Sequence, residues 1–321
     1  MLDKMQPAEF AQINVAYSRV FRPGRLSVGL VLPLEAYAVG AKPTLRGHLE
    51  AARSAENLGF AALWLRDVPF NVPDFGDPGQ IFDPFVYLGA LATATDRIAL
   101  GTSSVILPLR HPAHVAKAAA TVDVLSGGRL LLGVASGDRP EEYPAMDQSY
   151  DDRGARFRDV FEYIRAVGSS YPEYENAQGI LSGRIDLLPK PHGARLPMLI
   201  TGGSQQTPDW VAQNGDGWMT YPRNAVAQGQ VIADYRRRVQ AAGQPDKPVM
   251  QSLYVDVVAD PAVPPRPIHL GFQSGTDFLR SYLREIATLG VNHVALNLRF
   301  NQAPVDETLE HLADIVLPDF S

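Results

Sequence analysis

Residues 97–140, RIALGTSSVILPLRHPAHVAKAAATVDVLSGGRLLLGVASGDRP, decide the fold of this chain. Two runs of strand length within them, Ile98–Thr102 and Arg129–Val134, are almost wholly apolar. Between these runs, His111-Pro112 opens a helix with proline at its first position, and Gly127-Gly128 ends it. A strand–helix–strand unit whose strands are apolar throughout predicts a parallel sheet covered by helices.

Polar residues gather after both strands of this unit. They are Ser103, Ser104, His111, Ser136, Asp138 and Arg139. Because the carboxyl ends of parallel strands meet at one end of an α/β barrel, and chemistry sits at that end, we expect these residues to border a functional site.

The same alternation of strands and helices continues along the chain. The predicted strands are Leu26–Leu32, Ala61–Leu65, Ile98–Thr102, Arg129–Val134, Leu196–Thr201, Asp216–Thr220, Gln251–Val258 and Val291–Leu298. Eight strand–helix repeats fit a (β/α)8 TIM barrel better than an open doubly wound sheet. We therefore expect residues 1–321 to form a single barrel domain, with 1–22 as an N-terminal extension over the barrel base. Insertions are expected after strand two, at 68–81, and around the helix after strand four, at 139–153 and 169–197.

Composition excludes several classes of protein. The net charge of −6 is spread over both signs, whereas a nucleic-acid-binding protein shows a basic face. No window approaches the roughly 18 apolar residues that span a membrane, and the N-terminus lacks the apolar core of a signal peptide, so we expect a cytoplasmic protein. The absence of cysteine excludes disulfides, thiolate catalysis and cysteine-ligated metals. Histidine and carboxylate spacings show no metal-binding signature, and no metal is predicted.

The third-strand unit resembles the bacterial luciferase-like flavin monooxygenase superfamily, a family of eight-stranded barrels. The resemblance extends over residues 26–221 and is weak in the last third of the chain. The matching motifs are Gly101-Thr102, Val105–Pro108, His111-Pro112, Asp123-x-Leu-Ser-x-Gly-Arg129, Leu132-Gly-Val-x-x-Gly137, Ile200–Ser204, Trp210–Gln213 and Asp216–Trp218. The resemblance implies that flavin mononucleotide (FMN) binds across the carboxyl end of the barrel.

Gly202-Gly203-Ser204 follows a strand and precedes a helix that starts near Thr207. Glycines let backbone N–H groups approach an anion, and a helix N-terminus adds favourable partial charge. The residues alone allow either an ordinary capped turn or a phosphate site, and the resemblance places the phosphate of FMN there. Where the luciferase subunit has an arginine for this phosphate, the chain has Ser136, so either the Ser136 hydroxyl serves or Arg139 reaches in.

The expected cofactor-binding residues are Thr102, Ser103, Ser104, Ser136, Gly137, Arg139, Gly202, Gly203, Ser204 and Thr207. The resemblance implies a non-prolyl cis peptide at Ser103–Ser104, under the flavin ring. The alternative is that the two serines only satisfy backbone groups at the end of a strand.

The expected catalytic residues are Asp67, Arg66, His111 and Tyr143. Relatives often carry a carboxylate and then one or two histidines after the second strand. Here Asp67 matches the carboxylate, but Val68 and Pro69 follow it. Proton transfer at this corner must then use Asp67, Arg66, Tyr143 or another residue, unless Asp67 is only a structural partner of Arg66. His111 either caps the helix that follows it or lies at the pocket rim.

The resemblance implies a monooxygenase that takes reduced FMN from a separate reductase and uses O2 to oxygenate a small organic molecule. No strand is followed by the Gly-x-Gly-x-x-Gly turn of a nicotinamide site. The alternatives are hydride transfer with a deazaflavin on the same fold, and a flavin-binding protein without catalysis. A phosphosugar lyase or isomerase is disfavoured because no lysine ends a strand. Since family members commonly pair through helices, we expect a homodimer, and the substrate stays open.

Overall fold

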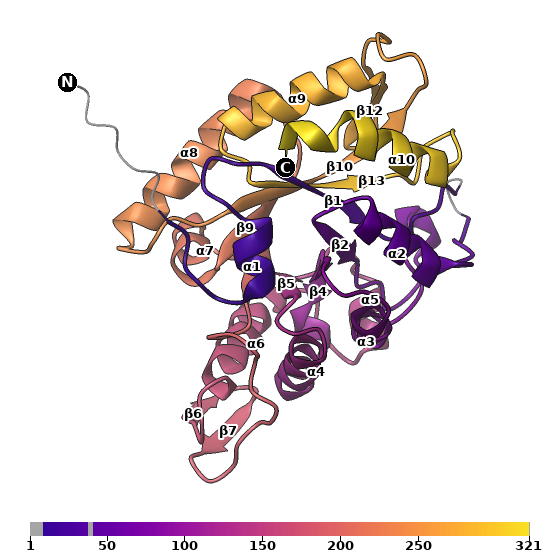
Figure 1. Ribbon diagram of the computed structural model, residues 1–321. Coiled ribbons are helices and arrows are strands. Elements are labelled where there is room, and N and C mark those ends of the chain that lie inside the picture. The colour runs from indigo at the N-terminus through magenta and orange to yellow at the C-terminus, as the bar shows by residue number, and fades with distance from the viewer. Residues whose placement is uncertain (1–8, 38–40, 321) are drawn as a thin grey trace, which may run out of the picture.

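The computed structural model describes residues 9–37 and 41–320 (Figure 1). Within these residues, eight parallel strands form a closed barrel. They are β1 (Ser27–Val31), β2 (Ala62–Leu65), β3 (Ala99–Thr102), β5 (Leu130–Ala135), β8 (Met198–Thr201), β9 (Gly217–Thr220), β10 (Val249–Val257) and β13 (His293–Asn297). Each strand pairs with the next in this order, and β13 pairs with β1 to close the ring. The predicted TIM barrel is confirmed, and each predicted strand overlaps an observed one.

Helices cover the outside of the barrel, as Figure 1 shows. After the eight strands in turn come α2 (His48–Asn57), α3 (Pro84–Ala94), α4 (Pro112–Leu125), α6 (Arg153–Val167), α7 (Pro208–Asn214), α8 (Ala225–Ala241), α9 (Thr276–Thr288) and α10 (Val305–Ile315). Three of them begin at a proline that follows a side-chain cap, namely Asp83 for α3, His111 for α4 and Thr207 for α7. These caps fix where the loops at the carboxyl ends of the strands stop.

The insertions lie where they were predicted, after β2 and β5. The first contains the 3-10 helix η1 (Pro73–Phe75). The second contains the short helix α5 (Glu142–Ala145) and a projecting hairpin of β6 (Glu173–Asn176) and β7 (Gly179–Ser182). Two further short pieces follow β3: strand β4 (Val105–Ile106), which pairs with β5, and the 3-10 helix η2 (Leu107–Leu109). The sequence did not predict the hairpin after β10, formed by β11 (Arg266–Ile268) and β12 (Gly271–Ser274).

The barrel interior is filled with side chains, because glycines on β3 and β5 make room for large ones. A Cβ on Gly101 would lie 2.4 Å from the Trp64 ring, and a Cβ on Gly133 would lie 2.7 Å from the Met219 sulfur. Trp64 Nε1 donates to His293 Nε2 (2.8 Å), and burial lowers the pKa of His293 to about 3, so this histidine is neutral. A packed interior restricts ligands to the ends of the barrel.

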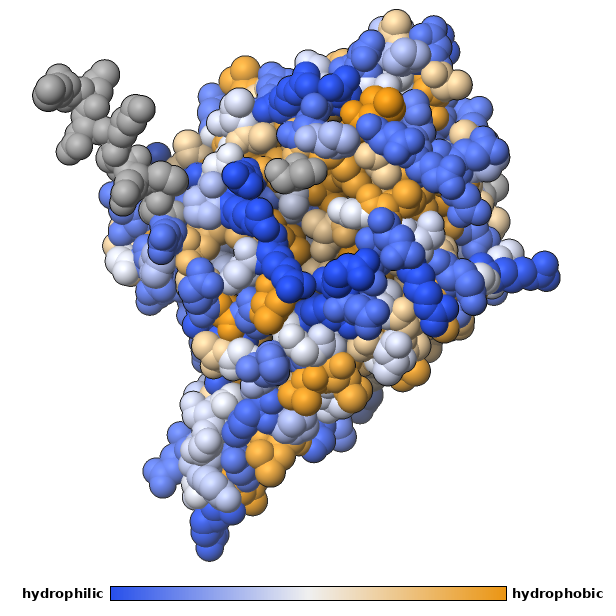
Figure 2. All heavy atoms as spheres, in the orientation of Figure 1, coloured by the Kyte–Doolittle hydropathy of each residue, from blue (hydrophilic) through white to orange (hydrophobic). Residues whose placement is uncertain are grey.

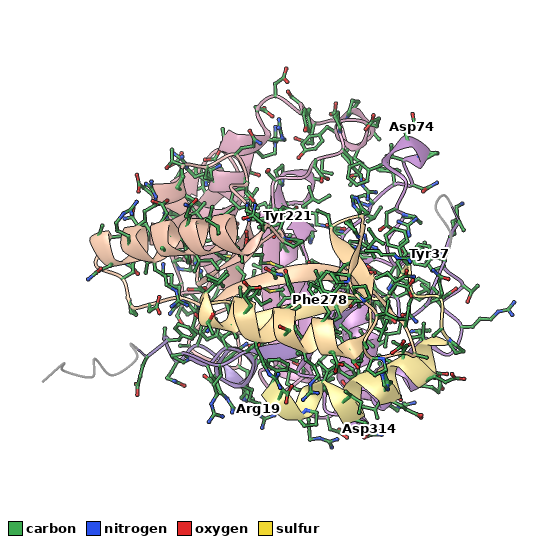
Figure 3. The ribbon with its side chains drawn as sticks, turned by 90° about the horizontal axis from the view of Figure 1, so that it is seen from above. Arg19, Tyr37, Asp74, Tyr221, Phe278 and Asp314 are labelled. Carbon is green, nitrogen blue, oxygen red and sulfur yellow. The ribbon has the colours of Figure 1, made fainter. Side chains whose placement is uncertain are left out.

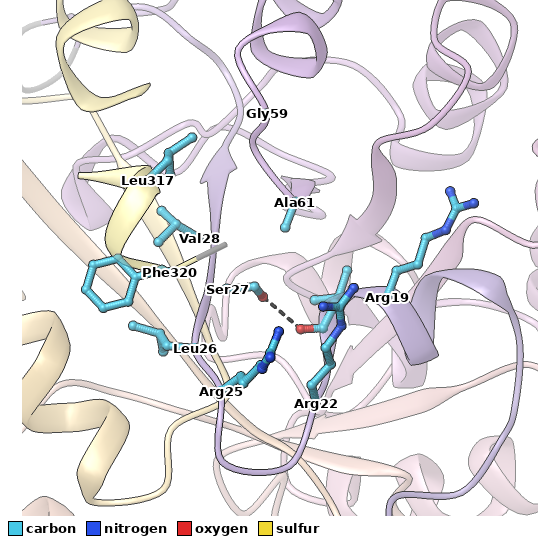
Figure 4. Close-up of a pocket in the computed structure, with 11 residues that line it drawn as sticks. Arg19, Arg22, Arg25, Leu26, Ser27, Val28, Gly59, Ala61, Leu317 and Phe320 are labelled. Atoms are coloured by element: carbon cyan, nitrogen blue, oxygen red, sulfur yellow. Dashed lines mark hydrogen bonds between the residues drawn. The ribbon is translucent and has the colours of Figure 1, made fainter. Parts of the chain in front are cut away.

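The amino-terminal segment closes the base of the barrel. Helix α1 (Val15–Val20) packs Ala16, Tyr17 and Val20 against Leu131 and Leu199 of the interior. Residues 1–8 of the expected extension lie outside the described residues. A cavity of about 220 Å³ at this base is lined by Arg19, Arg22 and Arg25 with the end of the 3-10 helix η3 (Leu317–Phe320) (Figure 4). It adjoins the amino ends of β1 and β2 and is therefore remote from the carboxyl ends of the strands.

Hydrophilic residues cover most of the face shown in Figure 2. Across 9–37 and 41–320, no helix combines the length and hydropathy that a membrane span needs. The same residues contain no group of three or more histidine, aspartate and glutamate side chains that could hold a metal ion.

Candidate active site at the barrel mouth

The carboxyl ends of β3 and β8 meet at the mouth of the barrel. The Ser104 hydroxyl is hydrogen-bonded to the Thr201 hydroxyl, and both lie beside the Met219 sulfur, at 3.6 and 3.3 Å. The Ser103–Ser104 peptide bond is cis, so the prediction of a non-prolyl cis bond is confirmed. Because Gly202 directly follows Thr201, the 103–104 corner and the glycine turn border one site.

The turn at 202–205 offers its backbone to a ligand. Gly202, Ser204 and Gln205 have φ angles of +54°, +44° and +60°, which fold the chain tightly after β8. The Ser204 hydroxyl donates to the Thr201 carbonyl (2.8 Å). In the described part of the chain, nothing accepts from the N–H groups of Gly203, Ser204 or Gln205. The turn thus presents three consecutive backbone donors, the arrangement that binds a phosphate oxygen.

Thr207 serves the following helix. Its Oγ1 accepts a hydrogen bond from the Trp210 N–H (3.2 Å) and begins α7, and the residue is exposed. Its hydroxyl retains the capacity to donate, since a hydroxyl accepts and donates at the same time. The site-forming atoms of this segment are nevertheless mainly those of the backbone at 203–205.

The first turn of α6 contacts the segment that contains the glycine turn, and Arg153, which the sequence analysis missed, lies there. It starts α6, and the carbonyl of the next residue, Gly154, accepts from Gln206 Nε2 (2.7 Å). The Arg153 guanidinium lies 3.7 Å from the Tyr150 ring centroid, and Nη1 donates to the Tyr150 carbonyl (2.8 Å). Its Nε is buried and makes no hydrogen bond within the described residues. The orphaned Nε leaves Arg153 able to bind an acceptor, but the cation that contacts this segment directly is Arg158, whose Nε and Nη2 donate to Gln206 Oε1 (3.0 and 2.9 Å).

The other residues expected to hold the cofactor lie at the ends of β3 and β5. Thr102 is fully buried, and its hydroxyl donates to the Gly133 carbonyl (2.7 Å), so it joins two strands. Ser136 is buried, and its carbonyl accepts from the Tyr143 hydroxyl. A Cβ on Gly137 would lie 2.9 Å from that same hydroxyl. These contacts fix the loop after β5, and Ser103, half-buried, follows β3 at the mouth.

Arg139 turns to the insertion after β2 instead of the glycine turn. Its Nη2 donates to the Asp77 carbonyl (2.8 Å), and its guanidinium lies 4.2 Å from the Phe75 ring centroid. Its Nη1 is 3.9 Å from Glu142 Oε1. Of the two groups expected to hold a phosphate, the Ser136 hydroxyl and Arg139, neither contacts the turn within the described residues, and Arg158 is the cation bonded to Gln206 beside it.

Asp67 is paired with Arg110, so the alternative interpretation, in which its structural partner is Arg66, was wrong about the partner. Arg110 Nε and Nη2 lie 2.9 and 2.8 Å from the two Asp67 oxygens, and the Ile106 N–H donates to Oδ2 (3.1 Å). Arg110 also contacts Asp83, the cap of α3 (2.9 Å). The carboxylate thereby ties the end of β2 to the segment that follows Ser104.

Arg66 belongs to a second cluster, centred on Asp77 in the insertion after β2. Asp77 Oδ2 lies 2.6 Å from Arg66 Nη1 and 2.9 Å from Arg299 Nη1. The hydroxyls of Tyr37 and Tyr254 donate to the same carboxylate (2.9 and 3.1 Å). Burial alone would raise the pKa of Asp77, but Arg66, the Gly79 N–H and Arg299 hold it well below its usual range. We call these five side chains the Asp77 cluster.

Two further residues predicted to act in catalysis, His111 and Tyr143, have partners of their own. His111 is exposed, and its Nδ1 accepts from the Ala113 N–H (3.2 Å) at the start of α4. Its ring packs edge-on against His114 and Tyr163. Tyr143 is fully buried, with its hydroxyl on Ser136. The structure therefore brings Arg66 and Asp67 to the mouth and gives His111 and Tyr143 contacts that fix loops.

Glu142 is a buried acid beside the mouth that the sequence analysis did not select. It is 1% exposed, its Oε1 accepts from the Phe70 N–H (3.4 Å), and its Oε2 has no hydrogen bond from any described residue. Burial raises its pKa to about 7, although Arg139 opposes the shift. Glu142 can therefore gain or lose a proton near neutral pH.

Glu142→Gln should make the protein less sensitive to alkaline pH. When the pKa of an acid rises on folding, the folded protein becomes less stable as the pH increases from the unfolded pKa, 4.5, to the folded pKa. In this range the unfolded chain releases the proton and the folded chain keeps it. The advantage of the variant over the wild type should grow by about 2 kcal/mol between pH 5 and pH 8. Urea unfolding at the two pH values measures it, with Glu141→Gln as the neighbouring control. A constant difference would mean that Glu142 titrates normally.

Comparisons with known proteins agree with this geometry. A family model described as luciferase-like monooxygenase matches residues 26–263. An uncharacterized protein of Mycobacterium tuberculosis is 30% identical over 65% of this chain and 79% of its own length. The F420-dependent hydroxymycolic acid dehydrogenase of the same organism is 27% identical over 69% of this chain and 60% of its own. The crystal structure of monooxygenase RslO1 from Streptomyces bottropensis superposes with a TM-score of 0.76, at 20% identity, over 92% of this chain and all of that one.

Proposed function

Because this chain belongs to the luciferase-like monooxygenase family and is an oxidoreductase, we propose that it uses reduced FMN and O2 to oxygenate a small organic substrate. The observation that carries the proposal is the junction of Ser104 with Thr201, which sets the 103–104 corner beside the three free donors of the 203–205 turn. We further propose that the protein works as a cytoplasmic homodimer and receives its flavin from a separate reductase.

The residues present fit a phosphate-bearing flavin. The N–H groups of 203–205 and the Arg153 guanidinium would hold the phosphate, and the 103–104 backbone would support the ring. Bound reduced flavin supplies the two electrons that reduce one oxygen atom of O2 to water while the other enters the substrate. The chain contributes orientation and a water-poor mouth, in which Ser104, Thr201 and Met219 pack together.

Arg153→Gln should weaken FMN binding by about 10- to 100-fold and leave riboflavin binding unchanged. The variant removes a charged donor to the phosphate, which is worth about 1.5–3 kcal/mol, and riboflavin lacks that phosphate. Flavin fluorescence quenching measures both affinities. Arg284→Gln, in the exposed ion pair with Asp319, is the matched control and should bind FMN as the wild type does. Equal losses for FMN and riboflavin would place the phosphate elsewhere.

A second candidate is hydride transfer with the deazaflavin F420. It is favoured by the relative named as an F420-dependent dehydrogenase. Parallel absorbance titrations with FMN and F420 discriminate the two, and binding of F420 alone would replace the first proposal. Oxygen consumption with reduced FMN and a substrate panel then separates an oxygenase from a protein that binds flavin without catalysis, since only the oxygenase forms an oxygenated product.

A further inference from the structure

The cofactor proposed above takes one half of the barrel mouth and leaves the other half for the substrate. The glycine turn follows β8 and the 103–104 corner follows β3, with β5 between them. Four of the five remaining strands, β10, β13, β1 and β2, bring Tyr254, Arg299, Tyr37 and Arg66, in that order, to the Asp77 cluster. Figure 3 shows Tyr37 and Asp74 on the same side of the molecule, with Tyr221, near the glycine turn, closer to its centre.

This second half of the mouth holds more positive than negative charge. Among the described residues, Arg66, Arg139 and Arg299 face two carboxylates, Asp77 and Glu142. Of the nearest other acids, Asp67 is bound to Arg110, and Asp138 acts on Arg139 but is exposed, so water screens its charge and the excess of buried positive charge remains. Buried cations are costly unless an anion accompanies them.

Two of these arginines also keep donors that nothing uses. Arg66 Nε and Arg139 Nη1 are buried and form no hydrogen bond with any described residue. Arg139 itself is 5% exposed. Buried donors are normally satisfied, so unused ones on two neighbouring guanidinium groups indicate a place for a further acceptor.

The contacts of Asp77 indicate which kind of acceptor fits these arginine donors. Its carboxylate receives both terminal nitrogens of Arg66, the paired geometry that guanidinium makes with planar oxyanions. It arrives on a short segment with Gly76 and Gly79 at positive φ, and the exposed side chains of Asp74 and Phe75 lie in the same segment. The carboxylate is thus carried on a loop, so a ligand can take its place when the loop moves.

We propose that the Asp77 cluster, together with the neighbouring Arg139, is the substrate's anion site: Arg66, Arg139 and Arg299 bind a carboxylate or sulfonate head group, and Asp77 holds that position when no substrate is bound. The inference rests on the proposed function, since it assigns this half of the mouth to the substrate. It restricts the substrate to organic anions and makes the 72–77 segment a lid that a ligand displaces, with Gln80, buried and bonded to the Arg66 backbone, as its anchor.

Three short probes test the site on the full-length protein by isothermal titration. Hexanoate and hexane-1-sulfonate carry the two head groups, and hexanamide has the same chain length without charge. Asp77→Asn removes the competing anion and should bind one or both anionic probes at least 10-fold more tightly than the wild type. Asp77→Asn/Arg66→Gln removes the recognising cation without leaving Asp77 unpaired, and should lose that gain. Asp74→Asn, in the same segment, should match the wild type.

Three outcomes would overturn the inference. The first is equal binding of hexanamide and the anions by Asp77→Asn. The second is equal anion binding by the single and double variants when circular dichroism shows both folded. The third is a 10-fold loss of FMN affinity in the double variant, which would assign the cluster to the cofactor. Failure of the wild type to bind any flavin, with the anion pattern intact, would instead reject the proposed function alone.

Discussion

Asp77→Ala should lower the free energy of unfolding by about 4 kcal/mol at pH 7. Removing one member of a buried ion pair costs about 3–5 kcal/mol because the partner charge is left without compensation. Here two arginines lose their anion at once, and the side chains of Arg299 and Asp77 are only 4% and 11% exposed. The hydroxyls of Tyr37 and Tyr254 lose their acceptor as well. Urea unfolding followed by circular dichroism measures the loss.

The free energy of unfolding lost in Asp77→Ala should be larger at neutral pH than at acidic pH. A carboxyl whose pKa falls on folding stabilises the protein above its unfolded pKa of 3.8, and that contribution disappears as the pH drops through the folded pKa. The gap between wild type and variant should therefore be complete at pH 7 and shrink below about pH 4. Asp74→Ala, exposed in the same segment, should change the free energy of unfolding by less than about 0.5 kcal/mol. Equal losses for the two variants would contradict the burial of this ion pair.

The fold was predictable because the strands are buried on both faces. Such strands read as mainly apolar runs: Arg129–Val134 is apolar after its first residue, and Val291–Leu298 is apolar except at Asn292, His293 and Asn297. Helix starts were predictable where a capping side chain stands before a proline, as at Thr207. The β11–β12 hairpin was missed because its residues, 266–274, include a proline and a glycine and form only three- and four-residue strands.

The two corners of the cofactor site were predictable because each is continuous in sequence. Ser103-Ser104 and Gly202-Gly203-Ser204 each directly follow a strand, so a short sequence motif is enough to identify each of them. The partners of charged residues were not predictable in this way. The partners of Asp77 come from four strand ends, and the most distant in sequence, Arg299, lies 222 positions away. Asp67 pairs with Arg110, which lies 43 positions further along the chain.

Arg153 illustrates a different reason for a missed residue. It lies at the edge of an insertion, in a segment that alternates in charge and has no apolar pattern. Its place near the glycine turn depends on how the next residue, Gly154, packs on Gln205 and Gln206. The one usable signal was its position as the first residue of a helix whose apolar face was already recognised, because the first turn of such a helix reaches the mouth of the barrel.

Asp67→Ala should lower the free energy of unfolding by about 3 kcal/mol. The variant leaves the Ile106 N–H without an acceptor and removes the buried partner of Arg110. The loss should be smaller than at Asp77, because the Arg110 side chain is 24% exposed and keeps Asp83. Asp67→Asn, which retains an acceptor for Ile106, should lose less than half as much. Urea unfolding ranks the three proteins.

The same pair of variants separates a positioning role of Asp67 from proton transfer. Both of its oxygens are occupied, one by Arg110 Nη2 and the other by Arg110 Nε and the Ile106 N–H, and its side chain is 1% exposed. A carboxylate held in this way keeps the segment after Ser104 in place, so Asp67→Asn should retain turnover within about 10-fold and keep the pH profile of the wild type. Loss of about 100-fold or more, with one limb of the pH profile abolished and the fold intact, is the signature of a general acid or base. That result would place proton transfer at Asp67 despite its three hydrogen bonds.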